Sequence, residues 1–179
     1  MSQVKKTFND LKKDVIDVSI CVSCGTCKAV CPVNVIELGD TIPKLVGNCI
    51  ECGICYANCP AAEFNEKEME EKIFGRTRKP KEELTGVYEA AYSARVTKEE
   101  IHDKAQDGGV VTALLIQFLE DGGDGVIASR LSEDQIWVPE PVVIKNKEEV
   151  VKAAGTKYTP SPTMVGVKRS EEHTSELQS

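Results

Sequence analysis

The sequence predicts an α+β chain in two parts, a small cysteine-rich domain over residues 18–62 and an incomplete α/β domain over residues 86–168. Three observations predict it. All eight cysteines fall in two copies of one spacing. A stretch rich in charge, residues 63–85, separates the parts. Beyond it, apolar runs of helical and strand length alternate, which is typical of an α/β domain.

The cysteines repeat the pattern Cys-x2-Cys-x2-Cys-x3-Cys-Pro, which is the bacterial ferredoxin signature for [4Fe–4S] clusters. Two copies predict two clusters, and hence a protein that moves electrons. Three ligands of each cluster come from one run and the fourth from the last cysteine of the other run. We therefore expect these two ligand sets: Cys21, Cys24, Cys27 and Cys59 for one cluster, and Cys49, Cys52, Cys55 and Cys31 for the other.

Other uses of these cysteines fit the spacing less well. Disulfides form in oxidising compartments, and the sequence carries no sign of secretion. Zinc sites pair two knuckles across a longer loop, a spacing that differs from this one. Gly25 and Gly53 each follow the second cysteine of a run, where the backbone must turn tightly around a cluster.

The elements of the first part follow from local pattern. Residues 1–17 are predicted to form a short amphipathic helix. Between the cysteine runs, residues 33–38 and 41–46 flank Gly39-Asp40, which indicates a β-hairpin with an apolar face toward the clusters. The following region is predicted as a helix over residues 63–73 and a charged linker over residues 74–84.

The second part begins near Gly86. Residues 110–119 are apolar nearly all round, so a buried helix is expected there, between Asp107-Gly108-Gly109 and Asp121-Gly122-Gly123. Residues 125–130 are predicted as a buried strand and residues 137–144 as one or two strands, with Trp137 in the core. Asn146 is expected to cap a helix that runs to Ala154.

Composition restricts the partners and the compartment. The formal net charge is −7, and the single basic stretch, residues 76–81, is expected to be a solvated linker. These features argue against a nucleic-acid partner. Residues 1–18 hold no signal-peptide pattern, and the longest apolar stretch is too short to span a bilayer. We therefore expect a cytoplasmic protein without its own membrane span, either free or peripheral on the cytoplasmic face of the membrane.

The last residues, 169–179, match the translation of a common short-read sequencing adapter. We expect this tail to be an artefact that follows a reading frame cut near Lys168, with a genuine polar tail as the alternative. It is therefore left out of the fold prediction.

Residues 86–168 resemble the first half of the family of β-subunits of coenzyme F420 hydrogenases and dehydrogenases. The motifs that carry the resemblance are Tyr88-Glu-Ala-Ala-Tyr-Ser-Ala-Arg95, Ala105-Gln-Asp-Gly-Gly-Val-Val-Thr112, Trp137-Val-Pro-Glu-Pro141, and Ala153-Ala-Gly-Thr-Lys-Tyr-Thr-Pro-Ser-Pro162. With the two-cluster domain in front, the layout is most similar to the electron-input subunit of F420H2 dehydrogenase complexes of methanogenic and related archaea.

The resemblance implies an α/β flavin-binding domain and an oxidoreductase. Family members bind FAD and exchange a hydride with coenzyme F420, after which single electrons pass to iron–sulfur clusters. The implied partners are redox subunits of a dehydrogenase or hydrogenase complex, which can be membrane-bound. No side chain is expected to act as an acid or base.

Two loops are candidates for the flavin site. The first, Gly108, Gly109, Val110 and Thr112, opens a helix and could cradle a pyrophosphate, or could be an ordinary glycine-rich helix start. The second, Gly155, Thr156, Lys157 and Tyr158, could place Lys157 near phosphate or the flavin carbonyls, or could be a plain helix C-cap.

Two further functions stay open. One is the input module of another F420- or ferredoxin-linked reductase, such as a formate dehydrogenase or a sulfite reductase. The other is a dicluster ferredoxin-type electron carrier without its own catalysis, and the chain with an unfinished flavin domain could behave as one.

Overall fold

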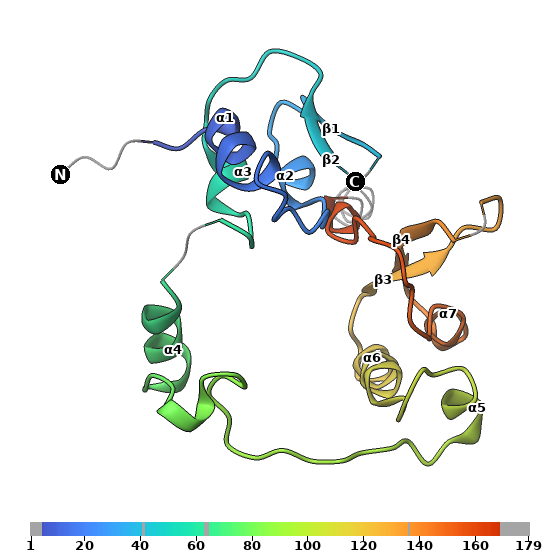
Figure 1. Cartoon of the computed structure of the whole chain (residues 1–179). Coiled ribbons are helices and arrows are strands. Elements are labelled where there is room, and N and C mark those ends of the chain that lie inside the picture. The colour runs from blue at the N-terminus through green and yellow to red at the C-terminus, as the bar shows by residue number, and fades with distance from the viewer. Residues whose placement is uncertain (1–4, 41, 63–64, 136, 169–179) are drawn as a thin grey trace. The chain divides into compact units, whose positions relative to one another are not determined.

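The computed structural model describes residues 5–40, 42–62, 65–135 and 137–168 (Figure 1). Its described residues fall into two compact units. One combines the residues up to 62 with those from 95 onward, and the other comprises residues 63–94. The adapter-like tail lies outside the described residues, as do parts of the predicted first helix and of the 63–73 helix.

The cysteine-rich region begins with a helix whose start is fixed locally. Thr7 and Asp10 form a capping box, in which the Asp10 carboxylate accepts from the Thr7 backbone N–H at 2.7 Å. Helix α1 (Phe8–Leu11) continues directly into the π-helical turn η1 (Lys12–Ile16). Phe8, Leu11 and Val15 are buried, so the predicted amphipathic helix is confirmed within the described residues.

The predicted hairpin is also confirmed. Strand β1 (Ile36–Gly39) pairs antiparallel with β2 (Ile42–Leu45), and Gly39 lies opposite Ile42. Two one-turn helices, α2 (Thr26–Ala29) and α3 (Ile54–Ala57), each follow the second cysteine of a run. The core holds few apolar side chains, and cysteines complete it: Phe8, Leu11, Val15, Ile36, Cys31 and Cys55.

Residues 65–94 form a small unit of their own, which corrects the prediction of a solvated linker. Helix α4 (Glu66–Phe74) is followed by the 3-10 turn η2 (Pro80–Glu82). Arg76 donates from both terminal nitrogens to the buried Glu82 carboxylate, at 2.7 and 2.9 Å. Arg78 and Glu70 form a second pair, in which the Arg78 backbone N–H donates to the carboxylate at 2.9 Å. The basic stretch is therefore paired within this unit.

This unit is expected to lose its order in acid. The Arg76 guanidinium and the Lys79 backbone N–H lower the pKa of Glu82 to about 2, from an ordinary value of 4.5. Because the folded-state pKa is depressed, the stabilisation is present above about pH 4.5 and is lost as the pH falls toward 2. Amide chemical shifts of residues 65–94, followed by NMR between pH 6 and 2, should report the loss.

The Glu82→Gln variant should show this disorder already at neutral pH. Glu71→Gln, which changes an exposed carboxyl of α4, is the matched control and should leave the spectrum unchanged. Shifts of the parent chain that stay constant down to pH 2 would contradict the role given to Glu82.

The region from residue 95 onward packs around its own core. Helices α5 (Glu99–His102), α6 (Val110–Glu120) and α7 (Lys147–Lys152) accompany an antiparallel pair, β3 (Val126–Leu131) and β4 (Pro139–Ile144). Asn146 caps α7, as predicted, by accepting from the Glu149 backbone N–H. One buried residue comes from each element: Ile101, Ile116, Val126, Ile144 and Val150. The observed architecture is a mixture of helices with small antiparallel sheets.

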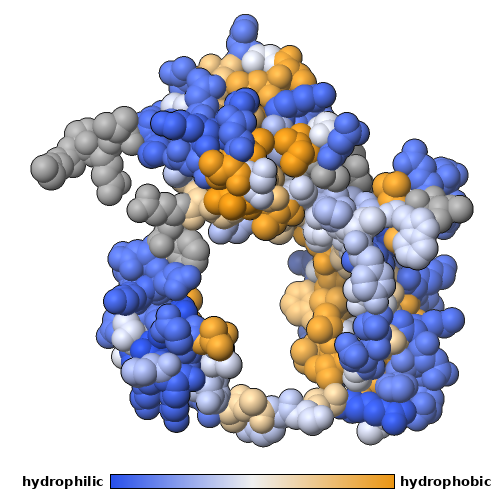
Figure 2. All heavy atoms as spheres, viewed as in Figure 1, coloured by the Kyte–Doolittle hydropathy of each residue, from blue (hydrophilic) through white to orange (hydrophobic). Residues whose placement is uncertain are grey.

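Two burial predictions for this region are wrong. In α6 only Ile116 is buried, while Val111, Leu114 and Phe118 are 71%, 64% and 52% exposed. Figure 2 shows this apolar face as orange spheres over α6. Trp137, expected in the core, is 63% exposed. Composition shows that a helix is apolar, but the number of faces that find a partner depends on the tertiary structure.

Gly109 has a packing reason to be glycine. It caps α6 with φ +73, and a Cβ built there would lie 2.9 Å from Val96 Cγ2. Gly122, just beyond α6, has φ +94 with nothing within 4 Å of such a Cβ. Gly122→Ala should therefore cost about 1 kcal/mol of unfolding free energy, from backbone strain alone. Gly109→Ala should cost about 1–3 kcal/mol more, because it also overpacks Val96. Denaturant unfolding followed by circular dichroism measures both, and equal costs would contradict the packing argument.

Within the part of the chain that the structure describes, no helix is long and apolar enough to cross a membrane.

Candidate iron–sulfur centre

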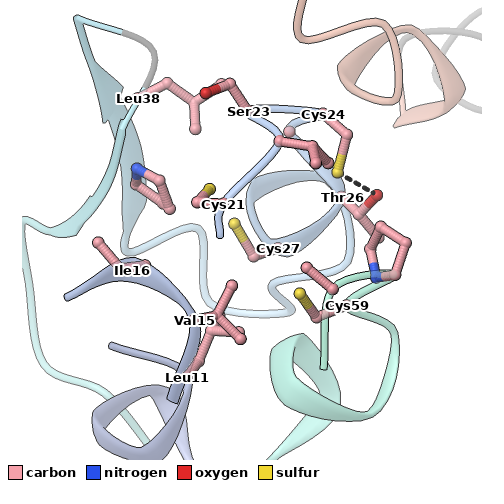
Figure 3. A pocket seen from close by; sticks show the side chains of 15 residues that line it. Leu11, Val15, Ile16, Cys21, Ser23, Cys24, Thr26, Cys27, Leu38 and Cys59 are labelled. Carbon is pink, nitrogen blue, oxygen red and sulfur yellow. Dashed lines mark hydrogen bonds between the residues drawn. The ribbon is translucent and has the colours of Figure 1, made fainter. Parts of the chain in front are cut away.

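The cysteines of the two runs line two separate cavities. Cavity A is lined by Cys21, Cys24 and Cys27 of the first run together with Cys59, the last cysteine of the second run. Figure 3 shows these four side chains around one space, with Leu11, Val15 and Ile16 on the side of the N-terminal helix. The rest of its lining is largely apolar and includes Leu38 and Pro43 of the hairpin.

Cavity B has the reciprocal composition. Its lining contains Cys49, Cys52 and Cys55 of the second run and Cys31, the last cysteine of the first run. Phe8, Val35 and Ile36 provide apolar walls. The structure thus brings the eight cysteines together as three from one run and one from the other, twice, which is the grouping that the spacing predicts.

The loops that carry the cysteines repeat one unusual backbone course. Ser23 and Glu51, the residues before the second cysteine of each run, have φ values of +55 and +54. Gly25 and Gly53, which follow that cysteine, have φ values of +81 and +79. Positive φ is costly for residues other than glycine, and its recurrence at equivalent positions indicates a functional constraint. Such turns can direct successive backbone N–H groups toward an anionic sulfur cluster.

Burial controls the thiols that face the cavities. Desolvation raises the pKa of Cys27 to about 12, from 9.0, and also raises the pKa of Cys55. Both thiols are therefore neutral at physiological pH when no metal is bound. A thiol gives up its proton when it becomes a metal ligand, so loading these cavities with iron would release protons.

The donor set fits [4Fe–4S] clusters. Each cavity offers four thiols, largely apolar walls and tight turns around the cysteines, which match the cysteine ligation of such a cluster. Cys24 Sγ also lies 3.2 Å from the Thr26 hydroxyl, and Glu51 donates its backbone N–H to Cys49 Sγ at 3.4 Å. Hydrogen bonds to ligand sulfur are one means by which a protein adjusts the potential of a cluster.

The structure gives the first flavin loop a largely structural setting. The Gly108 carbonyl accepts from the Val96 backbone N–H at 2.8 Å, and Gly109 packs on the same residue. Val110 and Thr112 lie in the first turn of α6, where Val110 is exposed and Thr112 half-buried. The loop thus occupies a helix N-terminus, as expected, and its glycines are also needed for packing.

The second flavin loop follows α7, and its lysine is engaged. Gly155 has φ +82 just after the helix C-cap. The Lys157 ammonium donates to the carbonyls of Ala153, Ala154 and Gly155, at 2.9 Å for the latter two. Burial lowers the pKa of Lys157. These contacts cap the C-terminus of α7. The neighbouring Thr156 and Tyr158 are exposed, so the lysine is the member of this loop that the fold holds in place.

Sequence reasoning missed one contact at the cavities. The Met164 backbone N–H donates to the Cys24 carbonyl at 3.0 Å, across 140 residues of chain. No periodicity or spacing in the sequence signals such a contact. The prolines at positions 160 and 162 indicated only a loop.

Comparison with known families assigns both parts of the chain. Residues 13–60 match the family described as 4Fe-4S dicluster domain. Residues 91–168 match the family described as Coenzyme F420 hydrogenase/dehydrogenase, beta subunit N-term. The chain belongs to this family of coenzyme F420 hydrogenase and dehydrogenase beta subunits. It combines the family domain with a dicluster iron–sulfur domain, and the relationship that the sequence motifs indicated is confirmed.

Curated relatives of this family match different shares of the chain. The beta subunit of the coenzyme F420 hydrogenase of Methanosarcina barkeri is 44% identical over 48% of this chain and 29% of its own length. The coenzyme F420-dependent sulfite reductase of Methanocaldococcus jannaschii is 32% identical over 81% of this chain and 20% of its own length. A component of the F420H2 dehydrogenase of Methanosarcina mazei is 26% identical over 89% and 44%. The chain spans less than half the length of each of these relatives.

Proposed function

We propose that this family member relays electrons through two [4Fe–4S] clusters between coenzyme F420, by way of a flavin, and a partner redox subunit. The observation that carries the proposal is the grouping of the cysteines, four around each cavity with one contributed crosswise. The names of the relatives support the F420 part, since they include components of two F420-linked enzymes and an F420-dependent sulfite reductase.

The chain's own residues would hold and shield the clusters. The eight cysteines are the proposed ligands. Leu11, Val15 and Ile16 keep water from cavity A, and Phe8 and Ile36 do so at cavity B. When bound, the clusters supply one-electron sites, and FAD supplies the exchange between the hydride of F420H2 and single electrons. We propose that Gly108–Thr112 and Gly155–Tyr158 belong to the flavin site.

Anaerobic purification tests the whole proposal. A protein that extends over the length of the relatives should contain about eight irons per chain, four for each cluster, and one flavin. It should oxidise F420H2 with an artificial one-electron acceptor. About four irons would contradict the two-cluster assignment, whereas full iron with no flavin and no F420H2 oxidation would contradict the enzymatic part alone.

Lys157 allows a test of the flavin site within that protein. If the second loop holds the flavin, Lys157→Met should weaken flavin binding about tenfold, equivalent to about 1.4 kcal/mol. It should also lower the thermal stability of the domain, because the carbonyls that end α7 lose their cap. Lys152→Met, an exposed lysine at the end of α7, is the control. Flavin titration and thermal unfolding of each variant separate the two effects, and a stability loss with unchanged flavin affinity would restrict Lys157 to capping.

A second candidate is an electron carrier of the dicluster ferredoxin type, without its own catalysis. The engagement of Lys157 by three backbone carbonyls and the packing role of Gly109 favour it for this chain, because both flavin loops then have a structural explanation. A flavin that copurifies with the relative-length protein in a one-to-one ratio would exclude this candidate.

A further inference from the structure

The two cavities are equivalent in sequence but differ in what covers them. At cavity A the turn is Cys24-Gly25, and at cavity B it is Cys52-Gly53. The two glycines have nearly the same φ, +81 and +79, and each caps a one-turn helix. The surroundings of the two turns can therefore be compared position by position.

The turn at cavity A is covered by the family domain. The Cys24 carbonyl accepts from Met164 N–H at 3.0 Å. A Cβ on Gly25 would lie 2.8 Å from Val165 Cγ2 and 3.1 Å from Pro162 Cβ. Gly25 is buried, so the segment Pro162–Val165, here called the covering turn, leaves no room for a side chain there.

The turn at cavity B is covered only by the N-terminal segment, among the residues that the structure describes. A Cβ on Gly53 would lie 2.5 Å from the Lys6 carbonyl oxygen. Beside it lies an open hollow lined by Lys5, Lys6, Cys52, Gly53, Ile54, Tyr56 and Ala57. The family domain reaches the neighbourhood of cavity B through the tip of one long side chain, Lys168, which donates to the Asn34 side chain beyond Cys31.

The covering turn is fixed to the sheet of the family domain. Ser129 Oγ on β3 lies 2.6 Å from Ser161 Oγ and 2.8 Å from Thr163 Oγ1. A Cβ on Gly166 would lie 2.7 Å from Ile127 Cγ2, so the end of the turn is packed on the same strand. A movement of β3 would therefore be passed to the backbone of Cys24.

We propose that the covering turn is a positioning element for Cys24, through which residues 95–168 act on the cluster of cavity A and not on that of cavity B. The Met164 N–H fixes the carbonyl beside the ligand sulfur, and Pro162 and Val165 exclude water from the turn. The surroundings of ligand sulfur and its exposure to solvent influence cluster potential. This inference rests on the proposed ligation of both clusters.

Met164→Pro tests the hydrogen bond, because proline lacks the N–H and is tolerated at the start of a helical turn. Met164→Ala keeps the N–H and is the matched control. Each is made in the full chain with only one cavity functional, the four cysteines of the other being replaced by alanine. The readouts are the EPR spectrum of the dithionite-reduced chain, the midpoint potential, and the rate of iron loss to a chelator.

With only cavity A functional, Met164→Pro should change the spectrum and the potential and should accelerate iron loss several-fold. Met164→Ala should not, and neither variant should affect the chain with only cavity B functional. Unchanged spectra in the first case, or equal changes at both cavities, would overturn the proposal. A uniform loss of stability would move both clusters alike, so the comparison separates positioning from folding.

A second pair of variants does not depend on the identity of the metal. In the chain as purified, Gly25→Val should speed hydrogen exchange at the Met164 amide at least tenfold, and Gly53→Val should not. A chain that takes up no iron contradicts the ligation, and this comparison then decides the contact alone. Equal exchange in the two variants would overturn the role of the covering turn.

Discussion

Replacement of all four cysteines of cavity A by alanine is expected to leave one intact cluster. This variant, Cys21, Cys24, Cys27 and Cys59 to alanine, should retain about four of about eight irons per chain and the EPR signal of a single reduced [4Fe–4S] cluster. The physical reason is the crosswise grouping, since cavity B keeps all four of its thiols. Iron and sulfide analysis after anaerobic reconstitution provides the measurement.

The matched variant replaces the four cysteines of the first run, Cys21, Cys24, Cys27 and Cys31. It removes the same number of thiols but leaves cavity B without Cys31. Fewer than four irons and no intact [4Fe–4S] signal are expected. If each run instead held its own cluster, the two variants would exchange their results. The pair therefore discriminates between the two ligations even if both variants lose some stability.

Removal of the clusters is expected to unfold the cysteine-rich region while the region from residue 95 onward stays folded. Among the described residues, the first core contains only four buried apolar side chains besides its buried cysteines: Phe8, Leu11, Val15 and Ile36. A small domain with so few buried groups depends on its metal, and metal-binding free energy is then folding free energy. Backbone amides of β1 and β2 should exchange on the order of 100-fold faster or more after anaerobic chelation.

The amides of β3 and β4 are the internal control in the same sample. Their core, with Ile116, Val126 and Ile144, contains no cysteine, so their protection should change little. Equal loss of protection in both hairpins would show that the two regions fold as one unit. Unchanged protection in β1 and β2 would show that the apolar residues suffice without metal.

Local sequence patterns predicted the elements with strong local signals. The capping box of Thr7 and Asp10, the Gly39-Asp40 turn and the Asn146 cap act within a few residues, so their outcome depends little on the rest of the chain. The predictions that failed concern burial. The exposed face of α6, the exposed Trp137 and the folded Arg76–Glu82 region each depend on which partners are available in three dimensions.

For the candidate site, the sequence by itself determined the ligand type and the crosswise grouping, because the spacing of thiols within a run limits which irons of a cube they can reach. The expected membership of the family also followed from motifs. Only the tertiary structure decided the differences between the equivalent parts. It placed Met164 against Cys24 but only the N-terminal segment against Cys52, and it bound Lys157 to the end of α7. Such contacts join residues far apart in the chain, so packing determines them and local pattern does not.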